Sequence, residues 1–246
     1  GSKTLLRFDV GIFSLHLIMT ASFVVVPALL SERLGMGLRS HSLLYLGVLV
    51  AGFLAMVPLI IRAERRGAMP VKRLAVILLA LSQLLLALAG AAVWHFVVAL
   101  LVFFAAFNLL EALLPSLVGR AAPAGTRGTA MGVYSTSQFF GVFVGGQLGG
   151  ALYQWWGAAA VFYGCMVLAL VWLLVLAGMQ EPAKLDNRVL RLQPGQDSKL
   201  LASQLQEVPG VVETVIVEEQ GLALLKVNAR ELDEARLEGL AGIAQS

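Results

Sequence analysis

Long apolar runs alternate with short charged, glycine-containing or proline-containing segments along the first three quarters of the chain. A hydrocarbon core about 30 Å thick is crossed by roughly 20 helical residues. Runs of about that length predict six spanning helices, over residues 8–30, 42–61, 71–89, 94–118, 129–150 and 158–178. After Glu181 the long apolar runs stop. The pattern therefore predicts an all-α bundle of transmembrane helices over residues 1–182 and a second, cytosolic domain over 183–246.

The second segment has the shorter hydrophobic runs of a small domain that contains both helices and strands. We expect a strand over 189–193, a helix over 198–207, a hairpin over 210–228 that turns at Gln220-Gly221, and a helix over 231–240. Pro209-Gly210 marks the break before the hairpin. This β-α-β-β-α order predicts an α+β ferredoxin-like domain that lacks its last strand. Regulation, oligomerisation and docking all remain open as its task.

Composition supports a membrane protein, because 59% of the residues are hydrophobic, only 13% are charged and the mean hydropathy is +0.83. Soluble domains carry about a quarter charged residues. Cys165 is the single cysteine, so neither a disulfide framework nor a thiolate metal site is expected. Phosphate-loop, metalloprotease and hydrolase motifs are absent from the sequence. We therefore expect no enzyme activity, no cofactor and no metal.

Charge is distributed unevenly along the chain. Residues 1–185 hold 12 Lys/Arg and 5 Asp/Glu, whereas residues 186–246 hold 6 and 10. Most basic residues fall in alternate connections, which the positive-inside rule assigns to the cytoplasm together with both ends of this segment. Aromatic residues at span ends mark the opposite side: Trp94, Tyr153, Trp155 and Trp156. This distribution argues against a nucleic-acid partner and favours either contact between the acidic tail and the basic loops or a mobile tether.

Glu111 lies within the apolar stretch "FNLLEALLPS". An acidic side chain at the centre of a spanning helix costs about 2.5–3.5 kcal/mol to insert, so Glu111 is expected to face protein or water. Asn108, Glu111 and Pro115 are spaced i, i+3, i+7 and share one helix face. A carboxyl group there can bind and release a proton as its access to water changes. The alternative is a structural carboxyl group that keeps one protonation state.

The first span carries a second polar stripe, because Asp9, His16 and Thr20 follow i, i+7, i+11. His16 is a candidate to share or relay a proton, or else a neutral packing group. Asp9, near the predicted cytoplasmic boundary, is a candidate gate or anchor. Further candidate cavity contacts in the fifth span are Tyr134, Ser135, Ser137 and Gln138.

The fifth span is also rich in glycine. Gly141, Gly145 and Gly149 form small-xxx-small pairs, a spacing that lets helices approach closely. Two interpretations remain open, a sliding interface with another bundle and static packing within this one.

The run "FNLLEALLPSLVGRAAPAGTRGTAMGVYSTSQFFGVFVGGQLGG" resembles spans ten and eleven of the major facilitator superfamily, in its YajR-like branch. The opening "RFDVGIFSLHLIMTASFVVVP" resembles span seven of that branch, so the resemblance covers the whole chain. It implies the second six-helix half of a twelve-span transporter, in a bacterial-type inner membrane. The first bundle would belong to a missing part of the chain or to a second subunit. The chain begins "GSKTLLRFDV", which we interpret as a cut end.

The segment "RAERRG" resembles the loop motif of the same family, with Glu64, Arg65 and Gly67 at matching positions. Ile60 stands where the motif has its first glycine, and Lys72 and Arg73 come late for its basic residues. Holding one conformation of a gate and simple positive-inside anchoring are both compatible with these residues.

These features together predict secondary transport of a small organic solute by alternating access. The solute would be exported in exchange for protons that enter through Glu111. The expected partners are the solute, protons, the lipid bilayer and the first bundle. The alternative is a non-transporting, membrane-anchored protein that acts through its cytosolic domain. A six-span homodimer also remains open.

Overall fold

The computed structural model describes residues 2–123, 125–179, 185–191, 198–217, 221–228 and 231–241. The chain forms two compact units. One unit comprises Ser2–Val118 and Gly132–Glu181, and the other contains Gly119–Met131 together with the C-terminal sheet. The predicted domain boundary at 182–183 lies outside the described residues.

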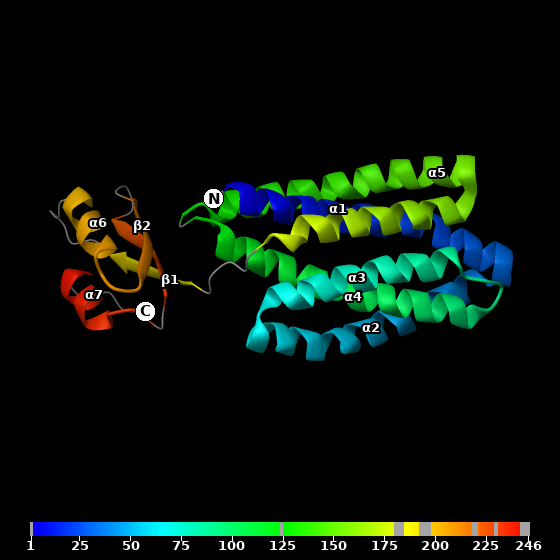
Figure 1. Ribbon diagram of the computed structural model, residues 1–246, viewed down its shortest axis with the longest axis horizontal. Coiled ribbons are helices and arrows are strands. Elements are labelled where there is room, and N and C mark those ends of the chain that lie inside the picture. The colour runs from blue at the N-terminus through cyan, green and yellow to red at the C-terminus, as the bar shows by residue number, and fades with distance from the viewer. Residues whose placement is uncertain are drawn as a thin grey trace. The chain divides into compact units, whose positions relative to one another are not determined.

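The membrane unit is built from long helices (Figure 1). They are α1 (Ser2–Leu34), α2 (Leu38–Arg66), α3 (Ala68–Ala87), α4 (Val93–Ala121) and α5 (Arg127–Ala177). All 5 are long and apolar enough to cross a membrane. The prediction of a bundle of membrane-spanning helices is confirmed.

The fifth and sixth predicted spans form the single element α5, which is 51 residues long. Gly157 interrupts it with φ 79° and ψ −179°, a conformation that side-chain-bearing residues rarely adopt. Figure 1 shows the ribbon of α5 reversing direction and running back along the bundle. The predicted break after residue 150 was wrong, because helix continues up to this glycine.

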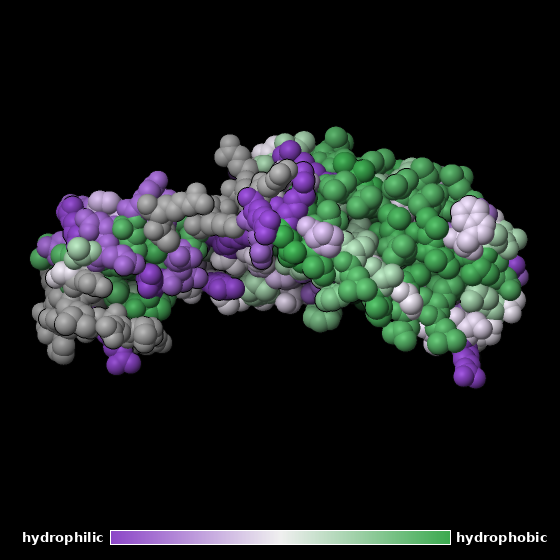
Figure 2. Space-filling view, turned by 90° about the horizontal axis from the view of Figure 1, so that it is seen from below, coloured by the Kyte–Doolittle hydropathy of each residue, from purple (hydrophilic) through white to green (hydrophobic). Residues whose placement is uncertain are grey.

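Hydrophobic side chains cover much of the outer surface of the membrane unit (Figure 2). α2 is the most outward-facing helix, with only 17% of its most apolar stretch buried against 56% for α3. Leu43, Leu54 and Phe53 on α2 are all more than half exposed. Such a surface is stable only when it is covered by lipid or by other apolar helices.

Glycines let α5 approach α1 closely. A Cβ atom at Gly141, Gly145 or Gly149 would lie within 2.7 Å of backbone atoms of α1, where no side chain fits. These glycines therefore occupy a close contact inside this bundle. Gly150 has no atom within 4 Å of its Cβ position.

The small domain contains β1 (Asp186–Arg191), α6 (Ser198–Gln206), β2 (Val211–Val217), β3 (Leu222–Val227) and α7 (Glu234–Ala241). Its strands form an antiparallel sheet in the order β1-β3-β2. This order confirms the predicted ferredoxin-like domain without a last strand. Its core consists of Leu190, Leu201, Leu205, Val208, Ala223, Leu225, Val227 and Leu237.

Two details of the small domain differ from the prediction or fall outside the described residues. The last helix begins at Glu234 instead of residue 231, because the Asp233 carboxylate accepts a hydrogen bond from the backbone N–H of Arg236 at 3.0 Å and caps the first turn. Gln220 of the predicted turn and residues 192–193 of the predicted strand lie outside the described residues.

Candidate functional site

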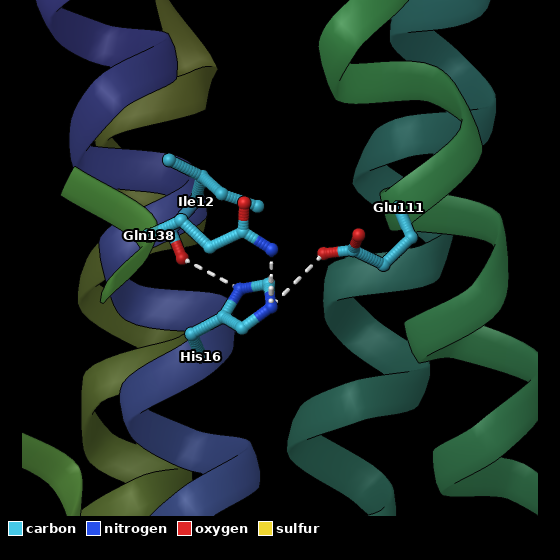
Figure 3. Close-up of polar contacts among 4 residues, drawn as sticks. All are labelled: Ile12, His16, Glu111 and Gln138. Carbon is cyan, nitrogen blue, oxygen red and sulfur yellow. Dashed lines mark hydrogen bonds and ion pairs between the residues drawn. The ribbon is translucent and has the colours of Figure 1, made fainter. Parts of the chain in front are cut away.

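The structure brings His16 of α1 and Glu111 of α4 together inside the bundle (Figure 3). The Nε2 atom of His16 lies 3.4 Å from Oε1 of Glu111. The His16 side chain is 7% exposed and that of Glu111 is 31% exposed. His16 and Glu111, which the sequence placed on separate helices, thus face each other.

The His16 ring has two further polar contacts. Its Nδ1 atom is 3.3 Å from the carbonyl oxygen of Ile12, one helical turn earlier on α1. Its Nε2 atom is 2.8 Å from the amide nitrogen of Gln138 on α5. A carbonyl oxygen only accepts and an amide nitrogen only donates, so this arrangement fits a neutral ring that carries its hydrogen on Nδ1.

A proton added to this ring changes its partners. Protonation places a hydrogen on Nε2, which can then no longer accept from the Gln138 amide. Oε1 of Glu111 lies within ion-pair distance of that atom but accepts no hydrogen bond in the present arrangement. Nε2 of His16 therefore has one partner, Gln138, when the ring is neutral, and a carboxylate close by when the ring is charged.

Other groups on α4 shape the surroundings of Glu111. Pro115 has no backbone N–H, so the carbonyl of Glu111 four residues earlier loses its helical donor. The Nδ2 atom of Asn108 is buried without a hydrogen-bond partner. The ring of Phe107 meets that of His16 edge-on, with centroids 5.6 Å apart. Unsatisfied polar groups of this kind are suited to water or to a polar ligand.

Asp9 does not join the His16–Glu111 pair. It is half-buried on α1, two turns nearer to the N-terminus than His16, and makes no hydrogen bond or ion pair with any described residue. Thr20, the third member of that stripe, has a buried hydroxyl group without a partner.

The residues of the loop motif lie where α2 ends and α3 begins. Gly67 has φ 100° and ψ 145° and lies directly between the two helices. Such a φ favours glycine, so Gly67 permits a connection of one residue. Glu64 and Arg65 lie on exposed positions of the last turn of α2. Their role in a gate stays a prediction.

The basic residues that follow belong to α3 and not to a loop. Lys72 is fully buried, with Nζ 4.3 Å from the centre of the Phe8 ring. Arg73 extends to the end of α5, where Nη2 lies 3.4–3.5 Å from the carbonyl oxygens of Leu176, Ala177 and Met179.

For two residues of α5, Gln138 and Tyr134, the structure shows surroundings that the sequence did not reveal. The sequence named Gln138 and Tyr134 among several cavity contacts but gave neither a partner. Tyr134 is 4% exposed, and its hydroxyl group has no hydrogen-bond partner. The available signal was their i, i+4 spacing, which puts both on one face of the helix. Among the described residues, no group of three His, Cys, Asp or Glu side chains could hold a metal ion.

Apolar helices of spanning length around a buried titratable pair are typical of a multi-pass membrane transport protein. The profile of the Major Facilitator Superfamily matches residues 9–219, and the chain belongs to this family of transporters, which are not enzymes. The chain is similar to the inner membrane transport protein YajR of Escherichia coli (strain K12), with 37% identity over 236 residues. That similarity covers 95% of this chain and 52% of the relative, and it supports the YajR-like branch.

Two further relatives are uncharacterized transporters from Buchnera aphidicola. The first, BU466 of subspecies Acyrthosiphon pisum (strain APS), is 29% identical over 58% of this chain and 37% of its own length. The second, from subspecies Baizongia pistaciae (strain Bp), is 25% identical over 70% of this chain and 44% of its own length. The chain thus spans about half the length of the relatives it matches, or less.

Proposed function

We propose that the full-length protein moves a small organic solute across the bacterial inner membrane by alternating access, exporting it in exchange for protons. Family membership supports the transport class, and the Escherichia coli relative named as an inner membrane protein supports the location. The first six-helix bundle would complete the pathway, and the ends of this segment would face the cytoplasm.

The observation that carries proton coupling is the 3.4 Å approach of Glu111 to His16 inside the bundle. Among the described residues, Glu111 lies within ion-pair distance of this imidazole and of no permanently charged Lys or Arg. Because both partners can lose their charge, the pair can exist in a charged or a neutral form. A carboxylate fixed by Arg would lack that freedom.

In the proposed cycle, Glu111 takes up a proton from one side of the membrane when water reaches it. In the alternative form the proton is on Nε2 of His16. This atom then donates to the Glu111 carboxylate and no longer accepts from the Gln138 amide. Reorientation of the bundle exposes the pair to the other side, where the proton leaves. Asn108, one turn from Glu111 with an unpartnered amide, is a candidate solute contact.

The test is proton uptake by the purified full-length protein after a jump from mildly alkaline to mildly acidic pH. We expect Glu111→Gln to take up about one proton fewer than the native protein, because the amide does not titrate. A pH-indicator dye in weakly buffered solution measures the difference.

Glu32→Gln is the matched control, because it makes the same change of side chain at a position that lies exposed near the end of α1, away from the His16–Glu111 pair. This variant should behave like the native protein over the same pH jump. Equal uptake by native protein and Glu111→Gln would overturn the proposal and favour a membrane-anchored protein that acts through its small domain.

A further inference from the structure

The sheet of the small domain has one face that its own helices leave open. Leu225 of β3 belongs to the core that this sheet forms with α6 and α7. Side chains alternate along a strand, so Leu224 and Lys226 point to the opposite face. Residues paired directly across an antiparallel sheet share a face, which places Val189 and Val215 beside Leu224. This second face, the open face, therefore carries apolar side chains next to a lysine.

The connection between α4 and α5 lies against the open face. The end of α4, the connection and the sheet all belong to the same compact unit. A Cβ atom added to Gly125 of the connection would lie 3.5 Å from Cδ1 of Leu224 and 3.7 Å from Cγ1 of Val215. Residues of the connection and of the sheet, among them Pro123 and Val189, also line a shared cavity of about 180 Å³. The apolar part of the open face is thus in contact with the connection.

Lys226 joins the open face to the end of α4. Its side chain is only 6% exposed, although lysine is almost never buried without a partner. Its Nζ atom donates to the carbonyl oxygen of Arg120 at 3.1 Å and to that of Ala122. The last carbonyl groups of a helix lack intrahelical donors and form the negative end of its dipole, so a cation is favoured there. Lys226 therefore caps the C-terminus of α4 from a distant part of the sequence.

The burial of Lys226 depends on the connection and not on the core of the small domain. Its side chain points away from that core, because Leu225 and Val227 on either side of it point inward. Burying an ammonium group is unfavourable unless acceptors replace its water. Two of those acceptors are backbone carbonyl groups at the end of α4 and in the connection. If the connection moved away, Lys226 would be exposed to water.

We propose that the open face is an intramolecular docking surface that clamps the α4–α5 connection, with Lys226 as its anchor. The surface recognises two features of its partner, the carbonyl groups at a helix C-terminus and a glycine turn that leaves room for the apolar side chains. α4 carries Glu111 and α5 carries Gln138, so the clamp holds together the ends of two helices of the candidate site. The small domain then acts as a brace and not as a module on a free tether. Docking requires no titration of Glu111, so it is independent of the proposed proton coupling.

The test measures how fast Lys226 reacts with a water-soluble amine-acylating reagent in the purified full-length protein, with mass spectrometry as the readout. The ammonium group is shielded as long as the contact stays closed. We expect Lys226 to react about tenfold or more slowly than the same lysine in protein unfolded by denaturant. Reaction at the unfolded rate would overturn the docking.

A substitution in the connection separates docking from burial within the small domain. Gly125 has φ 77°, which β-branched residues rarely adopt, and its Cβ position faces Leu224 and Val215. Gly125→Val leaves every residue of the small domain unchanged but should displace the connection, and acylation of Lys226 should become about tenfold faster or more. Gly128→Val is the matched control, because its Cβ position has no neighbour within 4 Å, and should keep the native rate.

Slow acylation in Gly125→Val, equal to that of the native protein, would show that the small domain buries Lys226 by itself and would also overturn the docking. Should Gly125→Val fail to fold, hydrogen exchange of Lys226→Met decides. Loss of the cap should speed exchange of the amides at the end of α4 about tenfold, because that turn then opens more often. Arg236→Met, at an exposed position of α7, is its control. Equal exchange in both variants would contradict the clamp.

Discussion

Electrostatic attraction and desolvation act in opposite directions on the charged form of the His16–Glu111 pair. Two opposite charges about 4 Å apart attract by about 4 kcal/mol at the effective dielectric constant of a protein surface. Removing each ion from water costs several kcal/mol, so desolvation opposes this attraction. A change in hydration at the 31%-exposed Glu111 side chain therefore changes the balance between the charged and the neutral form.

Gly145 is the residue at which helix packing can be tested most directly. A Cβ atom there would lie 2.8 Å or less from backbone atoms of Leu17 on α1, which cannot move aside as a side chain does. We expect Gly145→Ala to lower the stability of the full-length protein by about 1–3 kcal/mol, the usual cost of overpacking. Unfolding by denaturant in detergent measures it.

Gly164→Ala is the control, since its nearest neighbour outside the helix backbone is Leu152 Cδ1 at 3.6 Å. Alanine is favoured over glycine within a helix by roughly 0.5–1 kcal/mol, so this variant should be as stable as the native protein or more so. Equal stability of Gly145→Ala and Gly164→Ala would show that α1 and α5 are less closely packed than the structure indicates.

The pairing of residues across helices was beyond sequence reasoning. Helical spacing correctly put Asn108, Glu111 and Pro115 on one face of α4, because i, i+3, i+7 fixes direction around an axis. It carried no information on which face of α1 that stripe would meet. The approach of His16 to Glu111, and the contact of Gln138 with His16, depend on how α1, α4 and α5 pack.

The spanning helices were easier to predict from the sequence than the contacts between them, because bilayer thickness sets the length of an apolar run. Each predicted span lies in helix except for its last residues at 88–89 and 178. The predicted ends of the spans were less accurate. The fifth span was predicted to end at residue 150, but its helix continues to Gly157. The predicted end fell at Gly150, but a glycine inside a helical pattern is tolerated, and the helix continues past it.

Arg73 links the start of α3 to the end of α5. The last carbonyl groups of a helix lack intrahelical donors, and a cation near them is favoured by the helix dipole. Nη2 of Arg73 approaches three such oxygens. We therefore expect Arg73→Ala to lower the stability of the full-length protein by about 1–2 kcal/mol, measured by denaturant unfolding.

Arg62→Ala serves as the comparison, because Arg62 is an exposed basic residue near the end of α2. Its loss should change stability by less than about 0.5 kcal/mol, as is usual for surface positions. An equal loss for both variants would mean that positive charge, and not the cap on α5, is what Arg73 contributes.

For the whole molecule, alternating access makes a demand that a static anchor does not. Glu111 must meet water from both faces of the membrane in turn, and such exchange takes microseconds to seconds. Labelling over minutes therefore samples both states. A membrane-impermeant, water-soluble carbodiimide modifies carboxyl groups that water can reach.

We expect this reagent to modify Glu111 of the full-length protein in sealed vesicles of either orientation, as detected by mass spectrometry. Glu32, near the end of α1, and Glu64, near the end of α2, lie at opposite ends of consecutive helices and mark the two faces. Each marker should react mainly from its own side, with Glu64 on the predicted cytoplasmic side. Modification of Glu111 from a single side, with both markers reacting as expected, would contradict alternating access, because a carboxyl group open to one compartment can bind protons but cannot couple their passage to transport.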